Sequence, residues 1–184
     1  IVHHILLYQT DATVSSTPAP CQSPGGGPGW RMMFGWAPGG KNIELPPEAG
    51  FPQEGVTHYA VQVHYNNASA LVGEQDASGF KYCTGAPRQY DADIMAFGNV
   101  NFTINPNQSK SITCQMTYPA QLSPITTFAA LPHMHTLGKS ITTQKIPGGT
   151  GAAVDLGTAN PWDFNNQVFQ EFKQALSPGD VVKT

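Results

Sequence analysis

The chain has 184 residues, of which nine are basic, twelve are acidic and only 11% are charged, so its net charge is −3. This balance excludes the basic patches that nucleic-acid binding requires and the blocks of like charge that are typical of disordered tails. The apolar runs are far shorter than the roughly 20 residues of a membrane-spanning helix, so we predict no transmembrane span.

The first part of the chain alternates strand patterns with long turn-rich segments. Residues 1–8 are predicted to form a buried strand, and residues 10–29 an exposed loop rich in Ser, Thr, Pro and Gly. A short strand is expected at 32–36, followed by a turn-rich segment at 38–55.

The clearest alternation in the sequence lies at residues 58–65 and is typical of a β-strand. Its aromatic and aliphatic residues share one face and are predicted to face the core: Tyr59, Val61, Val63 and Tyr65. Gln62 and His64 fall together on the opposite face.

A broken, polar stretch at 73–92 indicates a domain boundary, and we predict domains at 1–75 and 93–184 joined by a linker at 76–92. The second domain contains strand patterns at 94–97, 100–104, 112–118, 125–131 and 140–146. Residues 164–176 fit either a helix or a strand. Many short strands between turns predict an all-β, sandwich-like fold.

Both ends of the chain are predicted to be cut. The sequence begins inside a strand pattern, without an initiator methionine or a signal peptide, and it stops where another strand begins, at 181–184. We therefore expect the middle part of a longer protein.

The cysteines and the glycosylation sequons favour an extracellular, oxidising setting. The number of cysteines is odd, and none forms a Cys-x-x-Cys pair: Cys21, Cys83 and Cys114. Three Asn-x-Ser/Thr sequons begin at Asn67, Asn101 and Asn107.

Five of the six histidines fall in three places, and they are His3, His4, His64, His133 and His135. On a strand, the last two would share a face at a distance of ~7 Å and could bind one metal ion; taken alone, they fit a surface pair equally well. His3 and His4 would face opposite ways in a regular strand, so binding one ion requires a twist, a bulge or an edge position. An imidazole-only set suits copper, zinc or nickel.

Three motifs in order resemble the copper type II, ascorbate-dependent monooxygenases. They are VHHILLY at 2–8, VQVHYNN at 61–67 and HMHTLGK at 133–139. The resemblance spans nearly the whole chain and implies two tandem jelly-roll-like antiparallel β-sandwich domains, both incomplete here, that bind two copper ions and use ascorbate as the reductant.

The resemblance also implies roles for the histidines. His3, His4 and His64 match the ligands of the electron-transfer copper in the first domain. His133 and His135 match the two histidine ligands of the oxygen-binding copper in the second.

Further residues take their expected roles from the same resemblance. Gln62 matches a glutamine proposed to help electron transfer. The partners of Cys21, Cys83 and Cys114 are expected to lie outside this chain. Residues 164–176 are expected to form a loop followed by a strand.

Two departures from the family pattern affect the second site. The family supplies a methionine as third ligand after the His-x-His motif, but no methionine follows Met134 here. The peptide-processing members carry an arginine where this chain has Leu131, which cannot pair with a carboxylate.

We therefore expect a secreted copper monooxygenase that hydroxylates an aliphatic C–H bond of an unidentified small molecule or peptide with O2 and ascorbate. The alternative is a non-catalytic extracellular structural or copper-binding glycoprotein that retains the monooxygenase scaffold and has assembly partners, and a third option is zinc in the same sites. The GKS sequence at 138–140 lacks the preceding glycine of a phosphate-binding loop, and the sequence has neither G-x-S-x-G nor H-E-x-x-H.

Overall fold

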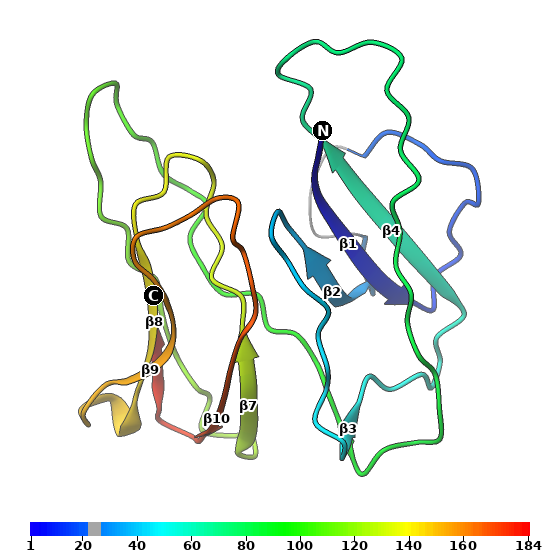
Figure 1. Cartoon of the computed structure of the whole chain (residues 1–184). Coiled ribbons are helices and arrows are strands. Elements are labelled where there is room, and N and C mark those ends of the chain that lie inside the picture. The colour runs from blue at the N-terminus through cyan, green and yellow to red at the C-terminus, as the bar shows by residue number, and fades with distance from the viewer. Residues whose placement is uncertain (22–26) are drawn as a thin grey trace. The chain divides into compact units, whose positions relative to one another are not determined.

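The structure, a computed structural model, describes residues 1–21 and 27–184. These residues are nearly all strand and loop, which confirms the all-β prediction. They divide into two compact units, Ile1–Pro38 with Asn42–Met95 and Gly39–Lys41 with Ala96–Thr184 (Figure 1). Among the described residues, none of the helices reaches the length and hydropathy that a membrane crossing requires.

The first unit is organised around β1 (Val2–Thr10). This strand pairs antiparallel with β2 (Arg31–Trp36) along one edge and with β4 (His58–Tyr65) along the other. A short parallel pair, β3 (Ala49–Gly50) with β5 (Tyr90–Asp91), completes the strands described in this unit.

Side chains on both faces of β1 are buried, which agrees with the continuous apolar run in the middle of the strand. Ile5 and Leu7 are buried on one face and Tyr8 on the other. The Tyr8 ring packs against Trp30, with ring centroids 5.6 Å apart. The predicted strands at 1–8 and 32–36 are confirmed.

The predicted orientation of residues 58–65 is wrong, although the strand itself is present as β4. Val61 and Tyr65 are 51% and 55% exposed, whereas Gln62 is only 7% exposed. β4 is an edge strand of the described sheet, and on the face of Val61 the buried side chains are those of the paired central strand, Ile5 and Leu7.

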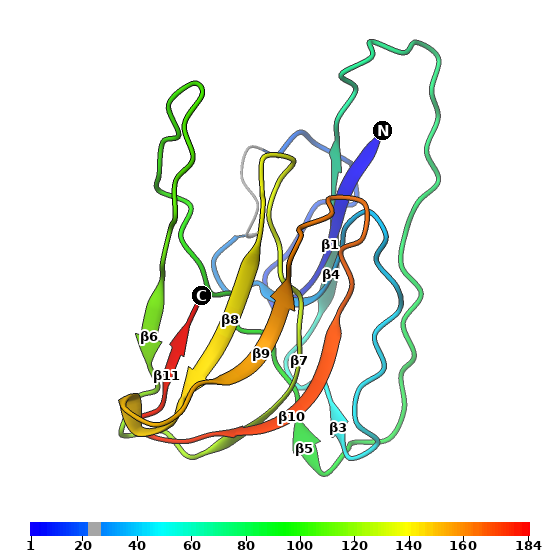
Figure 2. The same ribbon diagram turned by 60° about the vertical axis from the view of Figure 1, so that its left-hand side comes forward.

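The second unit contains two sheets (Figure 2). One has the order β6-β11-β8-β9 and the other pairs β10 with β7. The bounds are β6 Gln115–Thr117, β7 Ile125–Ala130, β8 Ile141–Ile146, β9 Val154–Ala159, β10 Gln170–Leu176 and β11 Val181–Lys183, with a short 3-10 turn, η1, at Pro147–Gly149.

The core of this unit draws on both sheets. Leu176 of β10 packs with Tyr118, Leu156 of β9 and Val182 of β11, and Phe172 of β10 lies against this cluster. Apolar side chains from two sheets meeting in one core make the unit a β-sandwich.

The strands at 125–131 and 140–146 are confirmed, and residues 164–176 form a loop followed by β10. The strands predicted at 94–97 and 100–104 are wrong: no strand is assigned there, and Val100 is 89% exposed. A strand forms only where a neighbour accepts its backbone hydrogen bonds, and alternation alone does not provide one. The strand expected at 112–118 is shorter, and β9 was not predicted.

Candidate metal-binding histidines

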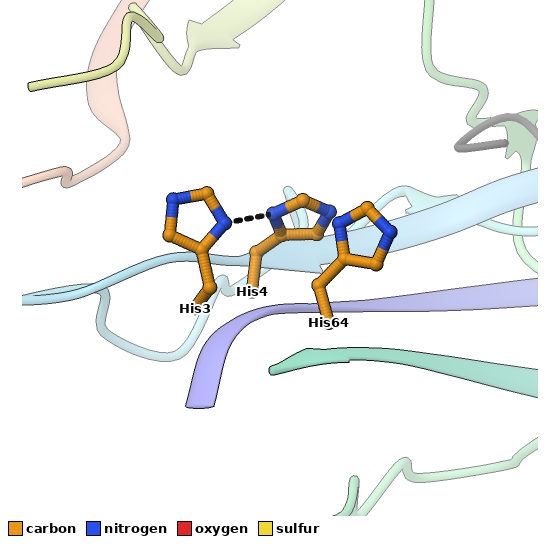
Figure 3. Close-up of side chains that lie close together, drawn as sticks. All are labelled: His3, His4 and His64. Atoms are coloured by element: carbon orange, nitrogen blue, oxygen red, sulfur yellow. Dashed lines mark hydrogen bonds between the residues drawn. The ribbon is translucent and has the colours of Figure 1, made fainter. Parts of the chain in front are cut away.

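Three histidines of the first unit converge on one place (Figure 3). His3 and His4 lie at the start of β1 and His64 near the end of β4. One ring nitrogen of each lies within 4.8 Å of one ring nitrogen of each of the others, and all three residues are half-buried. This is a spacing at which three imidazoles can bind one ion.

A β-bulge brings the adjacent histidines together. In the pairing of β1 with β4, Val2 lies opposite Tyr65 and His4 opposite His64, which leaves His3 as an extra residue without an opposite partner in the ladder. A bulge re-aims the side chains around it, which a regular strand cannot do for two consecutive residues. Of the twist, bulge or edge position that the adjacent histidines need in order to bind one ion, the structure has the bulge.

The rings of His3 and His4 face each other through their Nδ1 atoms. Nδ1 of His3 and Nδ1 of His4 lie 3.0 Å apart, as the dashed line in Figure 3 marks. A neutral pair at this distance shares one proton, since one Nδ1–H donates and the other Nδ1 accepts. Binding one ion through both atoms would require that proton to move to Nε2 of its own ring, which leaves both imidazoles neutral.

The donor set itself limits the ion. The three-residue group contains imidazoles and neither carboxylate nor thiolate. Neutral nitrogen donors suit copper, zinc or nickel, whereas magnesium and calcium prefer oxygen. The residues present therefore fit copper.

Gln62 lies on β4 two residues before His64, on the same face of the strand. It is buried, and its Nε2 donates a hydrogen bond to Sγ of Cys21 at 3.1 Å. The amide thus connects the strand that carries His64 to the loop that follows β1.

His133 and His135 lie in the loop directly after β7, and not on a strand as the sequence suggested. Their ring centroids are 5.3 Å apart, and the rings are inclined at 76°. The two side chains are therefore close enough to bind one ion together.

The His133 ring is held by a residue that the sequence analysis did not single out. Nδ1 of His133 lies 2.6 Å from Oε1 of Gln167, 34 residues further along the chain. Although part of His133 is exposed, desolvation lowers the pKa of its imidazole; the hydrogen bond to Gln167 opposes this effect and the nearby His135 adds to it. The direction of this shift favours the neutral imidazole, the form that binds a metal ion.

The other predicted residues are the three cysteines and the three sequons. Within the described part of the chain, Cys21, Cys83 and Cys114 form no disulfide with one another. The first sequon lies in a turn in which the Asn67 side chain exchanges two hydrogen bonds with the backbone of Leu71. The sequons at residues 101 and 107 are exposed.

Comparison with known proteins gives two family matches in tandem. Residues 1–71 match the family described as copper type II ascorbate-dependent monooxygenase, N-terminal domain, and residues 90–184 match the C-terminal domain of the same family.

Individual relatives match over the whole chain. It is similar to tyramine beta-hydroxylase of Caenorhabditis briggsae (30% identity) and to DBH-like monooxygenase protein 1 of Homo sapiens (30%), and covers 34% of each. It is also similar to dopamine beta-hydroxylase of Homo sapiens (29% identity), of which it covers 33%. The chain thus spans about a third of the length of these relatives.

Proposed function

Because the chain belongs to the copper type II ascorbate-dependent monooxygenases, we propose that it is the copper-binding part of an enzyme that hydroxylates an aliphatic C–H bond with O2. The family uses copper ions with ascorbate as the reductant. Bound copper supplies one-electron redox chemistry, which the side chains of this site lack.

The observation that carries this proposal is the convergence of His3, His4 and His64. The bulge at His3 places the Nδ1 atoms of His3 and His4 3.0 Å apart. This arrangement suits two ligands of one ion better than two unrelated surface histidines. In the proposal, this site holds the electron-transfer copper of a domain at residues 1–75, and buried Gln62 assists electron transfer beside it.

His133 and His135 are proposed to hold the oxygen-binding copper of the second domain, at residues 93–184. Residues 76–92 would link the two domains. A third, soft ligand is needed to favour Cu(I) at this site. The family pattern has a methionine ligand after the His-x-His motif, and no methionine follows Met134, so a ligand that matches this pattern would come from outside residues 1–184.

The proposed substrate lacks a terminal carboxylate. Leu131, two residues before His133, has no charge with which to bind one. Two of the similar proteins are named for tyramine and dopamine, and both names denote small amines. This argues against a glycine-extended peptide as the substrate.

The proposed location is the secretory pathway or the extracellular space, with glycans on Asn67, Asn101 and Asn107 and with disulfide partners for the three cysteines outside this chain. The sequons and the odd cysteine count support it. Treatment of the protein secreted from eukaryotic cells with an N-glycosidase would reduce its mass if these sites carry glycans.

The deciding experiment measures metal content and ascorbate-dependent O2 uptake of the full-length protein together. The proposal expects copper at both histidine sites and an uptake that His133→Ala abolishes, whereas His58→Ala retains it. His58 is a suitable control because its Nδ1 interacts with Oγ1 of Thr57, outside both groups.

The alternative is a non-catalytic glycoprotein that keeps the scaffold. It is supported by the second site, which has only two histidine ligands within this chain. Copper at one site or none, with no O2 uptake, would establish it. Zinc at both sites would equally contradict the enzyme, since zinc does not change its oxidation state.

A further inference from the structure

The loop between β9 and β10, residues 160–169, lies against the loop that carries His133 and His135. Among the described residues, three of the hydrogen bonds between the two loops come from Trp162 and Gln167. Trp162 provides two of them: its backbone N–H donates to the carbonyl of Lys139 at 2.8 Å, and its indole Nε1–H donates to the carbonyl of His135 at 3.2 Å. Gln167 provides the third, to the ring of His133.

The hydrogen bonds of Gln167 determine which of its side-chain atoms faces His133. Its amide nitrogen Nε2 lies 2.8 Å from the carbonyl oxygen of Phe164, which can only accept, so Nε2 is the donor in that contact. Oε1 is therefore the atom that faces His133, and an amide oxygen can only accept.

It follows that Nδ1 of His133 carries the proton. The neutral imidazole then has its free lone pair on Nε2, on the other side of the ring. The Gln167 side chain is only 1% exposed, so solvent does not compete for its hydrogen bonds. The ring of His133 is thus fixed in both orientation and tautomer before any metal arrives.

The turn behind the histidines is fixed as well. The N–H of Gly138 donates to the carbonyl of His135 at 2.9 Å, and the indole of Trp162 covers this glycine. Both ligands of the pair are therefore supported from one loop, His133 through its ring and His135 through its backbone.

We infer that Gln167 is a positioning residue of the second metal site, which holds His133 with Nδ1 protonated and Nε2 free to bind the ion, while Trp162 fixes the backbone of His135. This inference rests on the proposed function for the identity of the ion. The first site works differently, because there the Nδ1 atoms of His3 and His4 converge. The two sites thus present opposite ring nitrogens.

The test compares variants of the full-length protein. Gln167→Met keeps the approximate volume but removes the accepting oxygen, whereas Gln167→Glu keeps an acceptor. Gln170→Met is the matched control: the Gln170 amide lies in the same segment, but it binds both backbone groups of Thr158 and neither histidine of the pair.

The first readout uses metal-free protein with ¹⁵N-labelled histidine, in which the His133 signals are assigned from their loss in His133→Ala. We expect the Nδ1–H tautomer in the wild type and in Gln170→Met, a protonated Nδ1 in Gln167→Glu, and a mixture of tautomers in Gln167→Met. An Nε2–H tautomer in the wild type would overturn the inference. So would a Gln167→Met spectrum that matches the wild type.

The second readout is Cu(I) affinity, measured by competition with a chromophoric chelator. Loss of a hydrogen-bond partner behind a ligand costs about 10-fold to 100-fold in metal affinity. We expect such a loss at the second site in Gln167→Met, its recovery in Gln167→Glu and no loss in Gln170→Met. Equal losses in both methionine variants would show a general effect on folding and contradict the positioning role.

The two proposals can fail separately. A wild-type protein that binds no copper would overturn the proposed function, whereas the tautomer of the metal-free protein would still decide the inference about Gln167.

Discussion

His64 lies directly opposite His4 in the antiparallel ladder of β1 and β4, and the centroids of their rings are 4.2 Å apart. Two ligands of the first candidate site are thus held by backbone pairing between strands that are far apart in the sequence. The third, His3, is added by a bulge of one residue. The site depends on the register of one strand pair.

Replacing His64 by alanine removes the cross-strand ligand and leaves only two imidazoles at the first site. We expect this variant to lose the copper of the first site and to keep that of the second. Copper content should fall by one ion per chain, and ascorbate-dependent O2 uptake should fall with it. His58→Ala removes a histidine from the other end of the same strand and should change neither. Full copper content in His64→Ala would exclude the residue as a ligand.

Exchanging the metal should separate binding from electron transfer. Removing copper with a chelator is expected to abolish O2 uptake, and adding Cu²⁺ back should restore it. Zn²⁺ suits the same imidazole donors, so it should occupy the sites and raise the melting temperature without restoring uptake. Uptake by the zinc-loaded protein would contradict the proposed copper chemistry.

Gly138→Ala is expected to destabilise the second unit and to weaken the second metal site. A Cβ at this position would lie 2.8 Å from Cδ1 of Trp162 and 2.9 Å from Cβ of Met134, closer than real Cβ contacts. Overpacking of this kind costs about 1–3 kcal/mol, measurable by chemical denaturation. Gly98→Ala is the matched control, because a Cβ there meets nothing within 4 Å.

Asp180 should make the second unit sensitive to acid. Its carboxylate accepts hydrogen bonds from the backbone N–H groups of Gly148 and Ser177, at 2.8 and 2.9 Å, and these bonds lower its pKa below the usual value. Because the folded-state pKa is depressed, the stabilisation is present above the unfolded-state pKa and is lost as the pH falls through the folded-state value.

Asp180→Asn tests this dependence, since an amide can accept only one of the two hydrogen bonds. We expect a lower free energy of unfolding near neutral pH, by about 1–3 kcal/mol, and a smaller difference from the wild type in acid. Glu171→Gln removes the same charge from an exposed position of β10 and should have little effect. A difference between Asp180→Asn and the wild type that does not change with pH would contradict the role of the charge.

Sequence patterns predicted where strands form better than they predicted which side chains of those strands are buried. The alternation at residues 58–65 correctly indicated β4, but it could not show that β4 is an edge strand, where Val61 and Tyr65 stay exposed. Alternation between Val100 and Ile104 indicated a strand that does not form. Burial and pairing depend on neighbours that are distant in the sequence, and a local pattern carries no information about them.

At the candidate sites too, local motifs identified some residues, whereas others depend on contacts between distant parts of the chain. The histidines could be selected from the sequence, and the adjacent pair His3-His4 indicated that binding one ion needs a twist, a bulge or an edge position. Gln167 and Trp162 could not be selected, because they act on histidines 34 and 27 residues away and belong to no recognisable motif. Only the packing of the loop at 160–169 reveals them.

The position of β1 at the centre of its sheet has a consequence for how the first site is lost. This strand carries two of the three histidines and pairs with strands on both sides, so the ligands cannot separate without breaking that sheet. Unfolding of the unit should therefore also release the ion. Substitutions that loosen this sheet, even far from any histidine, should then lower the apparent copper affinity of the first site.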